Sequence, residues 1–337
     1  SDNLWTLEPR AIPQPEETLQ RLPFVRRSEG LAVSDTFLKG DSPFTIPADT
    51  RVTILLDQSF ETVAYPVLKI SGGKNATIKL TYAEALFDKD GQKRNRNEIN
   101  NKSIRGLYDI FHPDGGKGRT FTTLWFRTYR YLQIDVQTAG DPVTINDIFG
   151  IYTGYPFVHK ASFFANDSSL QKIWDAGWRT ARLCAGETYF DCPYYEQLQY
   201  EGDTRIQSLI SLYNTGDNRL MRKAINDFFI SRVPEGLTQG RYPSNRLQVI
   251  PPFSLFWVSM LYDYWMNCPD PEFLEKYLGA ANLVLEWYKN HIDKEYQMLG
   301  PMDWWNFTDW TLPDAGVPDG ADNGHSAVIT LQYVYTL

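Results

Sequence analysis

The sequence is poor in cysteine and histidine, and the spacing of both argues against the common metal and thiol sites. Its 337 residues include three cysteines, Cys184, Cys192 and Cys268, with no Cys-x-x-Cys pair. An odd, low count argues against a disulfide scaffold, and the missing paired spacing argues against a zinc site. The four histidines show no ligand spacing either. We therefore predict no metal site.

Basic charge and long apolar runs are also scarce. The chain has 33 Lys and Arg against 41 Asp and Glu, a formal net charge of −8. Because binding to phosphate backbones needs a basic face, we expect no nucleic acid partner. No stretch approaches the roughly 18 apolar residues of a membrane span, so we expect no membrane insertion. A Walker loop, a dinucleotide fingerprint and the serine- and zinc-hydrolase motifs are absent as well, and we expect no cofactor.

Aromatic residues, in contrast, are plentiful, with 10 Trp, 20 Tyr and 19 Phe. Large cores account for many of them. The total also suits sugar binding, because the apolar C–H faces of pyranose rings stack on flat aromatic rings while the hydroxyls need carboxylates and amides.

The two halves of the chain have different periodicities. Between about residues 50 and 155, short alternating segments separated by Gly-rich turns predict antiparallel strands, as at 51–56, 76–82 and 129–136. After Pro156 the apolar residues follow helical spacing. The predicted helices lie near 166–178, 204–213, 218–230, 253–266, 271–292 and 323–337.

These patterns predict a multidomain chain with an antiparallel β-sandwich followed by an incomplete all-α (α/α)6 toroid. We place a lead-in segment at 1–40, the β-sandwich at 41–160 and the first part of the toroid at 161–337. The chain ends inside an apolar helix without a capping residue, so we expect the helical domain to be truncated. Its start, Ser1-Asp2-Asn3, looks like an interior cut, and periplasmic and cytoplasmic bacterial locations both stay open.

The segment from Tyr189 to Asp203 is the most informative part of the sequence. Clustered acids raise one another's pKa, which keeps a carboxylic acid protonated near neutral pH. Glycoside hydrolysis needs such an acid to protonate the leaving oxygen, with a second carboxylate across the sugar. The simpler alternative is an acidic loop in which Asp203 caps the next helix. The segment holds four carboxylates in 13 residues: Asp191, Glu196, Glu201 and Asp203.

This segment resembles the signature loop of the bacterial α-L-rhamnosidases, a family of inverting glycoside hydrolases. Asp191-Cys-Pro, Glu196-x-Leu-x-Tyr200 and Gly202-Asp203 carry the resemblance. The resemblance implies that Glu196 is the general acid, that Asp191 and Asp203 bind sugar hydroxyls, and that Tyr200 replaces a ring-packing Trp. The loop is one residue shorter than the family pattern between Pro193 and the acid, and no Arg precedes the acid.

Other segments agree with this resemblance. Gly300-Pro-Met-Asp-Trp-Trp305 is similar to a family loop that brings an aromatic residue to the sugar, which makes Trp304 that residue, with Asp303 beside it. Trp310 is nearby without an assigned role, and Phe253 fits either a sugar-facing or a core position. Trp5-Thr-Leu-Glu-Pro-Arg10 resembles the lead-in to the family's β-sandwich.

The resemblance implies removal of terminal α-L-rhamnose by an inverting mechanism, with water attacking opposite Glu196. The family's general base lies in a later loop, so we expect the base beyond residue 337 and little hydrolysis by this chain alone. The expected partners are rhamnose-containing oligosaccharides, polysaccharides or glycosides, and a homodimer stays open. The rivals are an inverting toroid glycosidase for α-glucosides or α-fucosides, a polysaccharide lyase that uses a Tyr base, and a non-catalytic sugar-binding protein.

Overall fold

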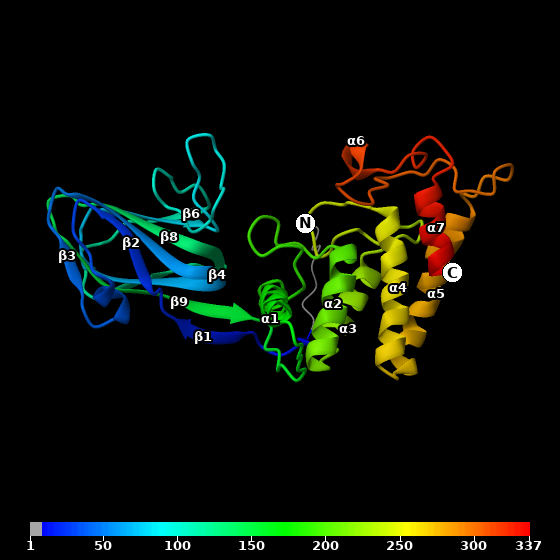
Figure 1. The fold of residues 1–337 in the computed structure, drawn as a ribbon, viewed down its shortest axis with the longest axis horizontal. Helices are drawn as coiled ribbons and strands as arrows, with labels where there is room; N and C mark the ends of the chain where they lie inside the picture. The colour runs from blue at the N-terminus through cyan, green and yellow to red at the C-terminus, as the bar shows by residue number, and fades with distance from the viewer. Residues whose placement is uncertain (1–8) are drawn as a thin grey trace. The chain divides into compact units, whose positions relative to one another are not determined.

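A computed structural model describes residues 9–337, and these divide into two compact units (Figure 1). One unit is a sheet that holds Pro15–Gly154. The other is helical and holds Tyr155–Leu337 together with the described part of the N-terminal stretch up to Gln14. Each unit has its own hydrophobic core, as expected for independently folding domains.

The sheet unit is one antiparallel sheet of nine strands. Its central path runs β1-β9-β4-β8-β5-β6, with β2 and β7 paired to β4 and β3 paired to β9. A short 3-10 helix, η1, spans Asp35–Lys39. The strands are β1 (Glu16–Gln20), β2 (Phe24–Glu29), β3 (Phe44–Ile46), β4 (Arg51–Gly72), β5 (Thr77–Ala83), β6 (Tyr108–Phe111), β7 (Arg119–Thr122), β8 (Arg127–Gln137) and β9 (Val143–Gly154).

Strand β4 organises this sheet because its two halves have different neighbours. The first half pairs with β8 and β2, and the second half pairs with β9 and β7. A bulge interrupts the pairing with β8 after Asp57, where Ser59 has a positive φ of 68°, and the pairing with β9 begins at Ala64. Bulges bend and twist a strand. Alternate residues of β4, such as Ile54 and Leu68, share one core with residues of β8 and β9, such as Ile134 of β8.

The helical unit packs its main helices on one core. Helix α2 packs against α4, and α4 also packs against α5 and α7. Helix α4 is apolar nearly all round because it is surrounded, with Trp257 and Tyr264 fully buried. The helices are α1 (Ser168–Leu183), α2 (Glu201–Thr215), α3 (Arg219–Ile230), α4 (Pro251–Asn267), α5 (Pro271–Lys289), α6 (Pro313–Gly316) and α7 (Ala327–Thr336).

The structure confirms an antiparallel sheet followed by helices, and all six predicted helices are present. Helix α1 has Asp167 as its N-cap, and the Asp167 side chain accepts a hydrogen bond from the Ser169 amide. Strands β1 and β2 lie inside the segment 1–40 that the sequence places as a lead-in. Residues 5–8 of the motif Trp5–Arg10 lie outside the described residues. Within residues 9–337, no helix is long and apolar enough to cross a membrane.

Candidate active site

The loop between α1 and α2 is folded into a tight turn that presents Glu196. The Asp191 amide donates to the Leu198 carbonyl at 2.8 Å, and the Leu198 amide donates back to Asp191 Oδ1 at 3.0 Å. Within this closed turn, Gln197 has a positive φ of 55° and reverses the chain. The Glu196 amide donates to Cys192 Sγ at 3.3 Å. Asp191 and Glu196 are thereby held in one turn of the loop by local bonds.

Helix α2 supplies the other two polar residues of the pocket. Tyr200 is the N-cap of α2, and Asp203 lies in its first turn. The Tyr200 side chain makes no capping hydrogen bond, and Asp203 is not the N-cap residue.

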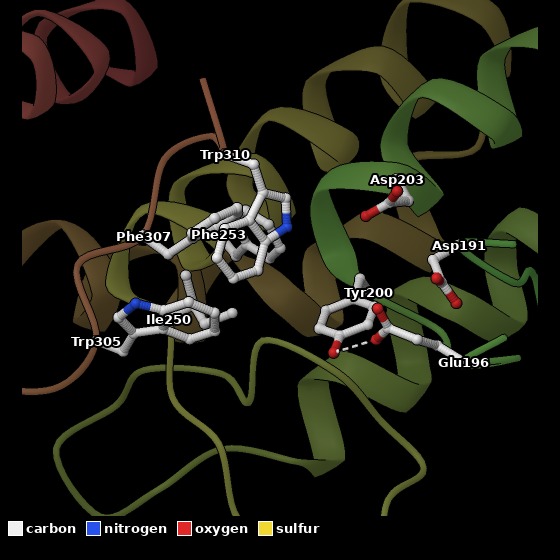
Figure 2. A pocket seen from close by; sticks show the side chains of 9 residues that line it. All are labelled: Asp191, Glu196, Tyr200, Asp203, Ile250, Phe253, Trp305, Phe307 and Trp310. Atoms are coloured by element: carbon white, nitrogen blue, oxygen red, sulfur yellow. Dashed lines mark hydrogen bonds between the residues drawn. The ribbon is translucent and has the colours of Figure 1, made fainter. Parts of the chain in front are cut away.

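Nine side chains line a pocket of about 120 Å³, with polar and apolar groups on different sides (Figure 2). Asp191, Glu196 and Asp203 lie on one side, with Tyr200 next to Glu196. The other side is formed by Ile250 and Phe253 at the start of α4 and by three aromatics of the loop after α5. The lining residues are Asp191, Glu196, Tyr200, Asp203, Ile250, Phe253, Trp305, Phe307 and Trp310. Such a split suits a ligand with hydroxyls on one side and a carbon surface on the other.

The acidic side of the pocket perturbs Asp203. Burial raises the pKa of the Asp203 carboxyl, and the nearby Asp191 and Glu196 raise that pKa further, against the opposing effect of its own backbone amide. A raised pKa means that Asp203 keeps its proton to a higher pH than an isolated aspartate does. The raised pKa that the sequence predicts for the cluster is therefore found at Asp203.

Tyr200 connects the acidic loop to a second loop. Its hydroxyl donates to Glu196 Oε2 at 2.8 Å and accepts from Arg241 Nη1 at 2.9 Å. Burial and the bond to Glu196 raise the pKa of Tyr200 to about 12, against the opposing effect of Arg241. Arg241 has no role in the sequence-based interpretation, because it lies 41 residues along the chain from Tyr200 with no motif around it.

The loop after α5 places its tryptophans differently from the sequence-based expectation. Trp305 and Trp310 line the pocket, whereas Trp304 and Asp303 are not among the lining residues. Trp304 has a positive φ of 72° and a side chain that is 42% exposed. The four residues predicted from the first loop therefore come together, and the two predicted from Gly300–Trp305 do not join them.

Glu201 is a buried acid next to the pocket rather than in it. Its side chain is 0% exposed, and neither carboxyl oxygen has a hydrogen-bond partner in the described chain. Burial raises its pKa well above the usual value, and the Thr238 hydroxyl opposes this shift while itself hydrogen-bonding Ser254 at 2.7 Å. No group of three or more His, Cys, Asp or Glu in residues 9–337 could hold a metal ion.

Comparison with known proteins identifies relatives of this architecture. The model of the bacterial alpha-L-rhamnosidase 6 hairpin glycosidase domain matches residues 158–337, which is 180 of the 337 residues. A search of the curated proteins found no match.

Solved rhamnosidases share the fold. A rhamnosidase from Bacillus sp. GL1 is similar with a TM-score of 0.76 and 24% identity, over 91% of this chain and 31% of that one. A Klebsiella oxytoca rhamnosidase solved with rhamnose bound gives a TM-score of 0.75 and 16% identity, over 92% and 63%. This chain thus spans less than two thirds of the length of either relative, and identities this low show likeness of fold.

Proposed function

Since the chain belongs to the bacterial alpha-L-rhamnosidase 6 hairpin glycosidase family, we propose that it acts in removing terminal α-L-rhamnose from glycosides or polysaccharides. The observation that carries this proposal is the pocket in which three carboxylates face an aromatic and aliphatic side. We further propose that residues 161–337 form part of an (α/α)6 toroid and that residues 41–160 belong to a β-sandwich.

In this proposal Glu196 is the general acid. It protonates the glycosidic oxygen while a water attacks the anomeric carbon from the opposite face, so the configuration inverts. The exposed position of Glu196 within its loop leaves it accessible to a leaving group. A base that activates the water is not assigned to any residue of this chain.

Asp191 and Asp203 are the proposed partners of the sugar hydroxyls. Charged acceptors make stronger hydrogen bonds than neutral ones, and their arrangement fixes the ring orientation. Asp203, with its raised pKa, can also donate when protonated. A pair that accepts at one oxygen and donates at another fits the alternating hydroxyls of a pyranose.

The apolar side of the pocket favours a deoxy sugar. Rhamnose carries a methyl group at C6, where glucose has a hydroxymethyl group. Ile250, Phe253 and Phe307 offer that methyl group an apolar surface, whereas a hydroxyl placed there would lose its hydrogen bonds to water. A fucoside, which also has a C6 methyl group, is therefore the closest competing substrate, and an α-glucoside is disfavoured.

The proposal is tested by comparing leaving groups in Glu196→Gln and Asp203→Asn variants of the whole enzyme. An acid matters most for a leaving group that needs protonation. We expect Glu196→Gln to lower hydrolysis of unactivated rhamnosides by about 10²–10⁴-fold and to affect p-nitrophenyl α-L-rhamnoside much less. Asp203→Asn should raise KM for both substrates, because its proposed role is binding.

The matched control is Glu235→Gln, an exposed glutamate of the same helical unit, which should leave both rates unchanged. Matching p-nitrophenyl glucoside and fucoside identify the sugar. Near-normal hydrolysis of unactivated rhamnosides by Glu196→Gln would rule Glu196 out as the acid. Saccharide binding without hydrolysis of any substrate would favour the non-catalytic alternative.

A further inference from the structure

Three groups from two loops form a continuous chain of hydrogen bonds that ends on Glu196. Arg241 Nη1 donates to the Tyr200 hydroxyl at 2.9 Å. That hydroxyl donates to Glu196 Oε2 at 2.8 Å (Figure 2). Each bond has ordinary length for its type. A hydroxyl has a single proton, so a Tyr200 that accepts from the guanidinium is free to direct its own proton at the carboxylate.

The backbone holds Arg241 and Tyr200 together independently of their side chains. The two residues form an antiparallel bridge. It is flanked by a bond from the Glu201 amide to the Gly240 carbonyl at 3.1 Å and by one from the Tyr242 amide to the Gln199 carbonyl at 3.0 Å. The bridge makes the pairing a fixed feature of the fold, so the side chains meet without a large loss of conformational entropy.

Further side-chain contacts fix the position of this bridge. Gln199 is buried and donates to the Tyr242 carbonyl at 2.8 Å and to Asp227 Oδ2 at 3.1 Å. The Tyr200 ring meets Phe253 edge-on, with ring centroids 6.5 Å apart. These contacts restrict both the backbone and the ring, and therefore the direction of the Tyr200 hydroxyl.

The negative side chains around Glu196 give this chain of hydrogen bonds an electrostatic role. Asp191 and Asp203 are negative neighbours in the same pocket, and the Cys192 sulfur accepts from the Glu196 amide. Arg241 is the positive group that the bond network connects to Glu196. Because a hydrogen bond to the charged form of an acid favours that form, the Tyr200 bond offsets the repulsion from the two aspartates.

Resting on the proposed function of Glu196, we propose that Tyr200 and Arg241 are positioning residues for the acid. Tyr200 holds Oε2 and leaves Oε1 to carry the proton toward the leaving oxygen. When Glu196 gives up that proton, the new negative charge falls on a carboxylate already bonded to Tyr200, and Arg241 stabilises it through the tyrosine hydroxyl. Tyr200, which stands where the family pattern has a ring-packing Trp, acts here through its hydroxyl.

The first test is the ionisation of Glu196, which can be followed without any hydrolysis. In protein carrying ¹³C-labelled glutamate, the Glu196 side-chain carbonyl is identified by its loss in Glu196→Gln and titrated by NMR. We expect Tyr200→Phe to raise the pKa of Glu196 measured in this way, because the bond to the carboxylate is lost. Arg241→Met should shift it in the same direction by less.

The second test is the pH profile of the whole enzyme. The alkaline limb of kcat/KM reports the acid that must be protonated in the free enzyme. Tyr200→Phe should move this limb upward and lower kcat by about tenfold with little change in KM. Tyr213→Phe and Arg246→Met remove comparable groups from exposed positions of the same unit and should leave the profile unchanged.

Several outcomes would overturn the proposal. If Tyr200→Phe raises KM and leaves the Glu196 titration unmoved, Tyr200 is a sugar-stacking residue only. If Arg241→Met raises KM and the titration stays unmoved, Arg241 contacts the sugar directly. A titration shift in a protein that hydrolyses no rhamnoside would keep the positioning role and refute the proposed function. Should Tyr200→Phe fail to fold, as judged by circular dichroism, Arg241→Met carries the same test.

Discussion

One buried acid of the sheet unit and one of the helical unit have opposite surroundings. In the sheet unit, Asp57 is 1% exposed and is held by Arg26 at 2.5 Å and by Arg130 at 3.1 Å. In the helical unit, Glu201 is 0% exposed and has no hydrogen-bond partner among the described residues. A compensated buried charge is an ordinary part of a scaffold, whereas an uncompensated one is costly and is typically found beside functional sites.

The largest effect should come from breaking the compensated acid. Asp57→Ala leaves two arginines facing a buried, empty position and should lower the free energy of unfolding by about 3–5 kcal/mol. Urea unfolding measures the loss, and hydrogen exchange in β4 and β8 locates it in the sheet unit. Asp41→Ala, an exposed acid of the same unit, is the control. A loss no larger than that of the control would mean that the ion pairs of Asp57 do not stabilise the sheet.

A change of opposite sign is expected for the uncompensated acid. Glu201→Gln keeps the shape and removes the ionisation, so it should raise the free energy of unfolding at pH 7 by roughly 1–3 kcal/mol. Because the folded state raises the pKa of Glu201 above its usual 4.5, the folded chain keeps a proton that the unfolded chain releases. The contribution of Glu201 to stability is therefore fully present below pH 4.5 and is lost as the pH rises.

Thermal unfolding of both proteins across this pH range measures the difference. The curves should meet near pH 4, where Glu201 is protonated in both states, and separate toward neutral pH. Parallel curves would show that Glu201 does not titrate abnormally. In that case Asp57 and Glu201 would differ only in their hydrogen bonds.

The smallest effect should distinguish two neighbouring tryptophans of the helical unit. Trp310 lines the pocket, and Trp304 does not. Trp310→Ala should weaken L-rhamnose binding by about tenfold through lost stacking on the sugar, and Trp304→Ala should change it little, as measured by calorimetry. The reverse result would favour the sequence-based assignment of Trp304.

The sequence predicts most of the helical unit because its helices repeat apolar residues on one face. In α3, for example, the residues that face the core of the helical unit are Leu220, Met221, Ala224, Ile225 and Phe228. It predicts less of the sheet edges. Strand β1 reads Glu-Glu-Thr-Leu-Gln, with no buried alternation, because it pairs at an edge where water faces its side chains.

The residues of the candidate site also differ in how well the sequence predicts them. Asp191, Glu196, Tyr200 and Asp203 are close in sequence and share a local motif, so their meeting in one pocket could be predicted. The loop at 300–312 is irregular, and no periodicity tells which of its tryptophans faces inward. Arg241 reaches Tyr200 through a backbone bridge between distant segments, and such a contact is set by the tertiary fold rather than by local pattern.

The divided pairing of β4 has a consequence for how the protein is made. Both halves of the sheet need this strand, and its last main partner, β9, ends at Gly154. On a ribosome, β4 therefore emerges long before β9, and one edge of β4 stays unpaired until β9 has been synthesised. Unpaired apolar strands are prone to aggregation, and pairing between distant segments is slow. The nascent sheet is thus the stage of synthesis at which chaperone protection would matter most.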